Sequence, residues 1–156
     1  MSRIPGKLTE GESYLFRIHN QISLSPGEPE SFVLVGPDNK RYLLVIKNYE
    51  KYELKTGQQI KCRVDKINCS GRIFLEPEHP VYKIGEKYEF LLTRIAERKD
   101  IWEKTIYTAW VKDVFENEWP CTVKNPDNLR PQVSQLTCIV KRIKKAELFL
   151  SLPDID

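Results

Sequence analysis

The stretch IKCRVDKI, residues 60–67, decides how this chain folds. Its apolar residues Ile60, Cys62 and Val64 alternate with polar ones, and a period of two is typical of a β-strand with one buried and one solvent-facing side. A similar pattern returns as LTCIVKRI at residues 136–143, so that residue 60 matches residue 136 at a shift of 76. The stretch therefore predicts a strand, and its recurrence indicates that the chain contains this strand twice.

Two further matches point to an internal duplication. Residues 11–16 (GESYLF) recur as residues 85–90 (GEKYEF), a shift of 74, and residues 73–75 (IFL) recur as residues 148–150 (LFL), a shift of 75. Repeats at a nearly constant spacing are the mark of a duplicated structural unit. We therefore expect two copies of one small fold.

A segment with two prolines separates the copies. It reads PEHP at residues 77–80, and proline cannot donate the backbone amide that a central strand needs. We assign the first copy to residues 1–77, a short junction to residues 78–84 and the second copy to residues 85–156. His79 has no second histidine near it in the sequence, so we interpret it as part of the junction and not as a ligand.

Each copy is predicted to form five short strands with little helix. In the first copy these are residues 13–22, 31–36, 40–47, 59–67 and 72–76, with a hairpin turn at 36–39 and one helical turn near 49–55. In the second copy they are residues 86–96, 105–113, 118–124, 134–143 and 146–151, with a loop at 125–131. Short strands between regular turn signals predict an all-β fold with a small barrel for each copy.

The composition is that of a globular protein. Of the 156 residues, 40% are hydrophobic and 30% are charged, and the net charge of +3 permits polyanion binding without requiring it. No apolar run reaches the ~18 residues of a membrane span, and the N-terminus has no apolar export signal. We therefore expect a cytoplasmic protein without membrane contact. The four cysteines show no CxxC spacing, so we expect reduced, mostly packed thiols, without disulfides or structural zinc.

The last third of each copy resembles a known family. Residues 54–67 (LKTGQQIKCRVDKI), followed by residues 71–76 (GRIFLE), look like the closing hairpin of OB-fold domains of the ribosomal-protein-S-one type. In the second copy, residues 136–143 followed by 148–152 (LFLSL) are similar to the same hairpin. The resemblance implies two tandem five-stranded OB-fold barrels with Greek-key topology, and RNA as the ligand class.

That family stacks a base on the ring of a Gly-Ala-Phe-Val element, which neither copy contains. Residues 31–35 (SFVLV) and 107–112 (YTAWVK) stand in its place. Phe32 can display its ring or pack in the core, because alternation allows either face of its strand to be the inner one. Arg41 and Lys47 are the solvent-facing cations of the next strand.

The second copy is richer in aromatic rings. Alternation in residues 105–113 turns Trp110 and Lys112 outward, so Trp110 is the leading candidate for an exposed ring, with packing between the copies as the alternative. Trp119 shares a face with core positions and is expected to be buried. Other rings and cations of this copy are Arg94, Arg98, Trp102, Tyr107 and Lys124.

The densest basic run of the chain lies at the last hairpin, in residues 141–145. Its charges suit contacts with phosphates, although a hairpin tip is also where solvated lysines commonly lie. Together with the residues above, the predicted nucleic-acid-binding set is Phe32, Arg41, Lys47, Trp110, Lys112, Lys141, Arg142, Lys144 and Lys145.

Catalysis finds little support in the sequence. It contains no nucleophile elbow, P-loop, glycine-rich dinucleotide turn or metal-ligand spacing, so we expect no catalytic residue, no metal and no cofactor. We predict a non-catalytic module that binds single-stranded RNA, or DNA, by aromatic stacking and phosphate contacts, without strong sequence preference. The alternative is a protein-interaction or scaffold module that uses the same surfaces for a partner protein.

Overall fold

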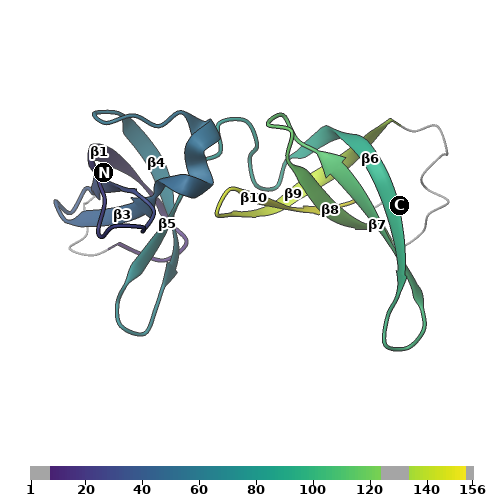
Figure 1. Cartoon of the computed structure of the whole chain (residues 1–156). Coiled ribbons are helices and arrows are strands. Elements are labelled where there is room, and N and C mark those ends of the chain that lie inside the picture. The colour runs from purple at the N-terminus through teal and green to yellow at the C-terminus, as the bar shows by residue number, and fades with distance from the viewer. Residues whose placement is uncertain (1–7, 124–133, 154–156) are drawn as a thin grey trace. The chain divides into compact units, whose positions relative to one another are not determined.

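The computed structural model describes residues 8–123 and 134–153, and the chain divides into two compact units. The first unit comprises Met1–Pro80 with Lys144–Ala146, and the second comprises Val81–Ile143 with Glu147–Asp156. The break after Pro80 falls inside the predicted junction of residues 78–84. Both units are mostly β, and each is built on one five-stranded sheet (Figure 1). No helix in the described ranges is long and apolar enough to cross a membrane.

The first unit has the sheet order β3-β2-β1-β4-β5, and the paired neighbours run antiparallel. Its strands are β1 (Ser13–Ile22), β2 (Ser31–Val35), β3 (Arg41–Val45), β4 (Gln59–Ile67) and β5 (Ile73–Pro77). A 3-10 helix, η1 (Ile46–Tyr52), follows β3 directly. The third strand is therefore shorter than the predicted 40–47, and Lys47 lies in the helix, which begins before the predicted helical turn.

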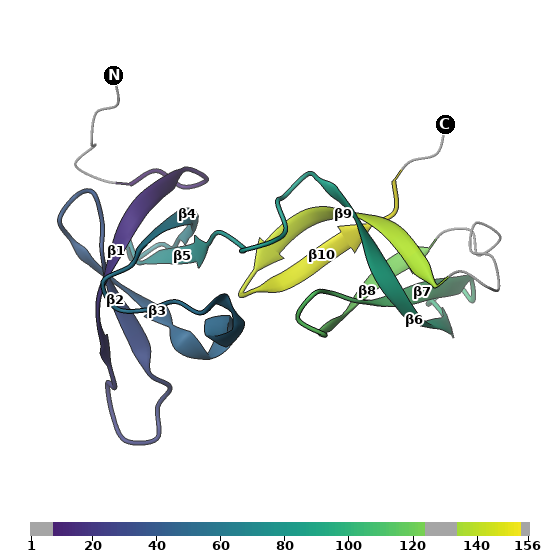
Figure 2. The ribbon, with the colours of Figure 1, turned by 90° about the horizontal axis from the view of Figure 1, so that it is seen from above.

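The second unit has a ring-like sheet with the order β10-β8-β7-β6-β9, in which β10 runs parallel to β8. Its strands are β6 (Lys87–Lys99), β7 (Thr105–Lys112), β8 (Glu118–Val123), β9 (Gln135–Lys144) and β10 (Glu147–Ser151). Figure 2 shows the strands of each unit from above. All ten strands lie where the sequence predicts them, with small differences at their ends, whereas the predicted loop at 125–131 lies outside the described residues.

The alternation in the two matching stretches confirms the inner faces that the sequence predicts. Cys62 and Val64 are 0% exposed in the first unit, and Cys138 and Val140 are 0% exposed in the second. The cysteines are free thiols, and those at 62, 121 and 138 are buried while Cys69 is exposed. Cys62 and Cys138 therefore act as small core residues, as predicted.

The two units share an irregularity as well as the order in which their first four strands pair. The pairing of β1 with β2 shifts by one residue between Ile18 and Asn20, and the pairing of β6 with β7 shifts between Leu92 and Arg94. These positions differ by 74 residues, which is the shift of the GESYLF match. A β-bulge is a specific feature of a fold, so its recurrence supports a duplication.

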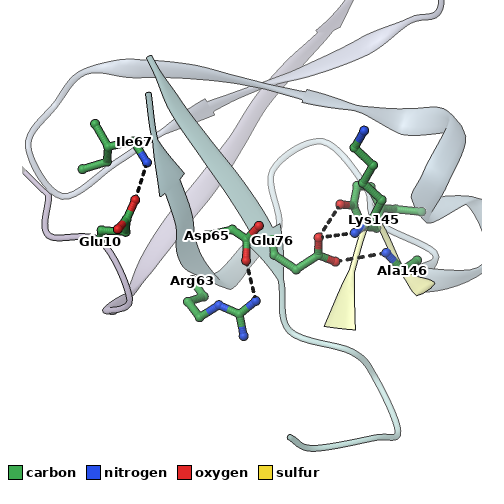
Figure 3. A network of polar contacts seen from close by, with 8 residues as sticks. Glu10, Arg63, Asp65, Ile67, Glu76, Lys145 and Ala146 are labelled. Carbon is green, nitrogen blue, oxygen red and sulfur yellow. Dashed lines mark hydrogen bonds and ion pairs between the residues drawn. The ribbon is translucent and has the colours of Figure 1, made fainter. Parts of the chain in front are cut away.

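The first unit contains a buried carboxylate (Figure 3). Glu76 is 5% exposed and accepts hydrogen bonds from the Tyr49 hydroxyl at 2.9 Å and from the amides of Lys145 at 2.6 Å and Ala146 at 3.2 Å. Lys145 and Ala146 both have positive φ angles, 51° and 64°, which cost energy for residues other than glycine. Glu76 thus holds a strained turn that the sequence did not place in this unit.

His79 is a packed residue of the first unit. It is 5% exposed, and its ring meets that of Tyr52 edge-on at a centroid distance of 5.2 Å. Its burial beside an aromatic ring gives it a structural role at the end of β5, within the first unit and not in a separate junction.

Candidate nucleic-acid interface

The outer face of β7 and β8 carries its side chains in rows that run across the strands. Thr108 lies opposite Thr122, Trp110 opposite Pro120, and Lys112 opposite Glu118. The residues between them form the core: Ala109 and Val111 are 0% exposed, and Cys121 and Val123 are 1% exposed. Because successive side chains of a strand point to opposite faces, the three pairs face outward.

Strand β10 extends these rows. It pairs in parallel with β8, with Leu150 beside Cys121 and Ser151 beside Thr122. Continuing this register backward along both strands places Phe149 beside Pro120, and Glu147 at the level of Glu118. We call Trp110, Pro120 and Phe149 the ring row, and Lys112, Glu118 and Glu147 the charged row.

The ring row, together with Glu118 and Glu147 of the charged row, lines a groove of about 520 Å³ on the second unit. This volume is within the range of ~300–1,000 Å³ that is usual for sites of small organic ligands. Its apolar lining comes from the ring row together with Trp119, Leu148 and Leu150, and its polar lining comes from Arg98, Thr108, Glu118, Thr122 and Glu147. The groove therefore combines flat rings with hydrogen-bonding groups at its sides.

A cation holds the central ring of the groove. Trp110 is half-buried, and the guanidinium carbon of Arg94 lies 4.5 Å from the centroid of its ring. A cation over an indole face is attracted by the electron density of the ring, which fixes the orientation of the side chain. Trp110 turns away from the core, as predicted, and one of its faces is occupied by arginine.

The β-bulge after Leu92 fixes one carboxylate of the charged row. The hydroxyl of the bulged residue Thr93 lies 2.8 Å from Oε1 of Glu118, to which it donates, and 2.9 Å from the carbonyl oxygen of Trp110. A bulge commonly redirects a side chain in this way. Glu118 is thereby positioned at the edge of the groove.

Trp119 differs from its prediction. It is half-buried and not fully enclosed; its indole nitrogen donates a hydrogen bond of 2.7 Å to Oδ2 of Asp113, and the residue also lines the groove. The indole N–H of a largely enclosed tryptophan usually finds a hydrogen-bond partner, and here that partner is the buried carboxylate of Asp113. The side chain therefore belongs partly to the core and partly to the candidate site.

Phe32 cannot stack on a base in this structure, which corrects the prediction. It is 5% exposed and packs in the core of the first unit. Its neighbours Ser31, Val33 and Leu34 are buried as well, so both faces of β2 are covered and the alternation rule had no outer face to identify. Arg41 and Lys47 are exposed, but they also belong to the first unit and do not line the groove.

The basic run is not part of the groove lining. Lys141 and Arg142 are exposed positions of β9, Lys144 ends that strand, and Lys145 lies in the turn that Glu76 binds. Lys124 lies outside the described residues. Of the nine predicted residues, all of which are described, Trp110 lines the groove and Lys112 stands beside it in the charged row.

Phe149, Glu118 and Glu147 are groove residues that sequence reasoning missed. Phe149 could have been found from the sequence, because it matches Phe74 at a shift of 75. In the structure both rings are partly exposed, Phe149 at 44% and Phe74 at 39%. The two glutamates gave no signal, because their positions depend on the pairing of β8 with β10.

Comparison with known proteins adds no identification. No family model matches the chain, and none of the curated proteins matches it in sequence. Within the described part of the chain, no three His, Cys, Asp or Glu side chains form a group that could hold a metal ion.

Proposed function

We propose that the chain is a tandem OB-fold protein whose second unit binds single-stranded nucleic acid, primarily RNA. The proposed role is non-catalytic. The observation that carries the proposal is the ring row of Trp110, Pro120 and Phe149 in a groove of about 520 Å³. The two aromatic rings of this row, Trp110 and Phe149, lie on the outer face of a small β-sheet unit and provide a platform on which bases can stack. The strand order of the ring-like second sheet is compatible with an OB-fold barrel.

Cations near the ring row supply the second requirement. Arg98 lines the groove, Arg94 lies over Trp110, and Lys112 lies in the adjacent row. In the proposed mechanism a base stacks against the ring row while these side chains contact the flanking phosphates. Such contacts release counterions, so binding weakens as salt rises.

A protein-interaction role is the second candidate, and one specific observation favours it. The turn between β6 and β7 exposes Ile101 by 85% and Trp102 by 74%. Asp100 shapes this turn, because its Oδ1 accepts the amides of Trp102 at 2.8 Å and Lys104 at 2.9 Å. Exposed tryptophans are enriched among the residues that dominate protein interfaces.

The test is fluorescence anisotropy with a labelled single-stranded RNA and the full chain, at ~50 mM and ~200 mM salt. Each stacked base contributes ~1–3 kcal/mol, so Trp110→Ala is expected to weaken binding by about fivefold to a hundredfold. Trp102→Ala is the matched control, because it removes an indole that does not line the groove. It is expected to leave RNA affinity unchanged.

Absence of RNA binding at low salt would refute the nucleic-acid proposal and leave the protein-interaction role. Equal losses in the Trp110 and Trp102 variants would argue against the groove as the stacking site. Binding to DNA of the same sequence, measured in parallel, shows whether the 2′-hydroxyl contributes.

A further inference from the structure

Two carboxylates in a groove for a polyanion need an explanation. Glu118 and Glu147 both line the groove, where Arg98 is the single cation among the described lining residues. A carboxylate repels phosphates and cannot contribute to the electrostatic part of nucleic-acid binding. It can, however, accept hydrogen bonds from base edges, which specify sequence where phosphate contacts do not.

We propose that Glu147, with Glu118 beside it, selects guanine among the bases that stack on the ring row. The inference rests on the proposed function and goes beyond it, because it assigns a base preference and the residues that read it. It also replaces the expectation of binding without strong sequence preference.

The register places the carboxylates at a suitable separation from the rings. Glu118 and Pro120 are same-face neighbours on β8, and Glu147 and Phe149 are same-face neighbours on β10. Such neighbours lie ~7 Å apart along a strand, and adjacent strands lie ~4.8 Å apart. A base stacked over Pro120 and Phe149 therefore points one edge toward the charged row.

The two carboxylates differ in how firmly they are held. Glu118 accepts the hydrogen bond from Thr93, which fixes one of its oxygens. Glu147 is exposed at the start of β10, and within the described ranges it has no hydrogen bond or ion pair to another side chain. Glu147 is thus the carboxylate with both oxygens available to a ligand.

The chemistry of a carboxylate discriminates between bases. An ionised carboxylate is an acceptor with two oxygens and has no donor. Guanine presents N1–H and the N2 amino group side by side, so it can donate two parallel hydrogen bonds. Cytosine and adenine each place one amino group beside a ring nitrogen that accepts, and uracil places one N–H between two carbonyl oxygens. The expected order is guanine first and uracil last.

The experiment uses short uridine RNA oligomers that carry guanine, cytosine, adenine or uracil at the central position. A single guanine avoids the four-stranded structures that guanine runs form. Anisotropy titrations compare the full chain with its Glu147→Gln and Glu118→Gln variants. Glu89→Gln is the matched control, because Glu89 is exposed on β6 and does not line the groove.

The unmodified chain should bind the guanine oligomer about fivefold to a hundredfold more tightly than the uridine oligomer, the range expected for one bidentate contact. Glu147→Gln should remove most of this preference without lowering the affinity for the uridine oligomer. Structural damage would instead lower the affinity for every oligomer. Equal affinity for all four oligomers, or an equal loss for all of them in the Glu147 variant, would overturn the inference and leave the proposed function intact. Failure to bind any oligomer at low salt would refute both.

Discussion

Replacing Glu76 with alanine is expected to lower the free energy of unfolding by about 2–4 kcal/mol. Tyr49 is 4% exposed, so its hydroxyl would lose its acceptor in a buried position, at a cost of ~1–3 kcal/mol. The amides of Lys145 and Ala146 would each lose a bond with a net value of ~0.5–1.5 kcal/mol. Removing a carboxylate from a buried position offsets part of this loss. Urea denaturation of the full chain, followed by far-UV circular dichroism, measures the difference.

The same side chain makes a prediction about pH. Burial raises the pKa of Glu76 above its ordinary value of 4.5, although the bonds from Lys145, Tyr49 and Ala146 partly oppose the rise. Between 4.5 and the raised pKa, the folded chain holds a proton that the unfolded chain has lost, so stability falls as pH increases. Glu76→Gln cannot ionise and lacks this dependence. The stability advantage of the unmodified chain over Glu76→Gln should therefore shrink as pH rises through this window.

The control for this experiment is Glu12→Gln, which removes an exposed carboxylate from the same unit. Its stability relative to the unmodified chain should change little over the same pH range. A difference between the unmodified chain and Glu76→Gln that grows with pH would refute the reasoning, because it would mean that folding stabilises the charged form of Glu76.

Three further predictions concern the turns and thiols. Lys145 has a φ angle of 51°, which glycine adopts at less cost than lysine, so Lys145→Gly should raise the free energy of unfolding by about 0.5–1 kcal/mol in a urea titration. Lys144→Gly, at the end of β9, is the control and should lower it. In the native protein a thiol reagent should label Cys69 rapidly and the buried cysteines slowly, and rapid labelling of several thiols would contradict the burial. Asp113→Ala should cost about 2–3 kcal/mol in thermal melts, because Asp113 is 7% exposed and binds the Trp119 indole as well as two amides. Asp100 also accepts two amides, but in the exposed turn between β6 and β7, so Asp100→Ala should cost under about 1 kcal/mol. Equal losses in the Asp113 and Asp100 variants would count against the burial argument.

Much of the fold could be read from local patterns, because a period of two survives wherever one face of a strand is buried. The predicted bounds of β1 and β4, 13–22 and 59–67, are those of the structure. The rule failed at β2, where Phe32 and Val33 point to opposite faces and are both buried, at 5% and 7% exposure. It also overextended β3, because the apolar run continues through Ile46, where the 3-10 helix begins.

The candidate site was less accessible to sequence reasoning, because it depends on pairing between distant segments. Alternation within β7 was sufficient to turn Trp110 outward. Its neighbours in the groove come from β8 and β10, whose parallel pairing joins Cys121 to Leu150. Nothing local in the sequence specifies that register, so the charged row of Glu118 and Glu147 became visible only in the structure.

The matching strand pairs of the two units carry different side chains on their outer faces. In the first unit Asn20 pairs with Val33. The position that matches Asn20 in the second unit, 74 residues later, is Arg94, and it pairs with Trp110. Val33 in turn lies opposite Leu43, where Trp110 lies opposite Pro120. The first unit therefore has aliphatic side chains in place of the indole and an amide in place of the cation that holds it.

This divergence favours the second unit over the first as the place of the proposed base stacking. Val33 is 7% exposed, so the position that corresponds to Trp110 presents almost no surface to a ligand. The neighbouring position, Leu43, is 44% exposed but aliphatic, and it lacks the π-face on which a base stacks. A substitution at Leu43 should leave RNA affinity unchanged, whereas the equivalent ring row of the second unit should control it.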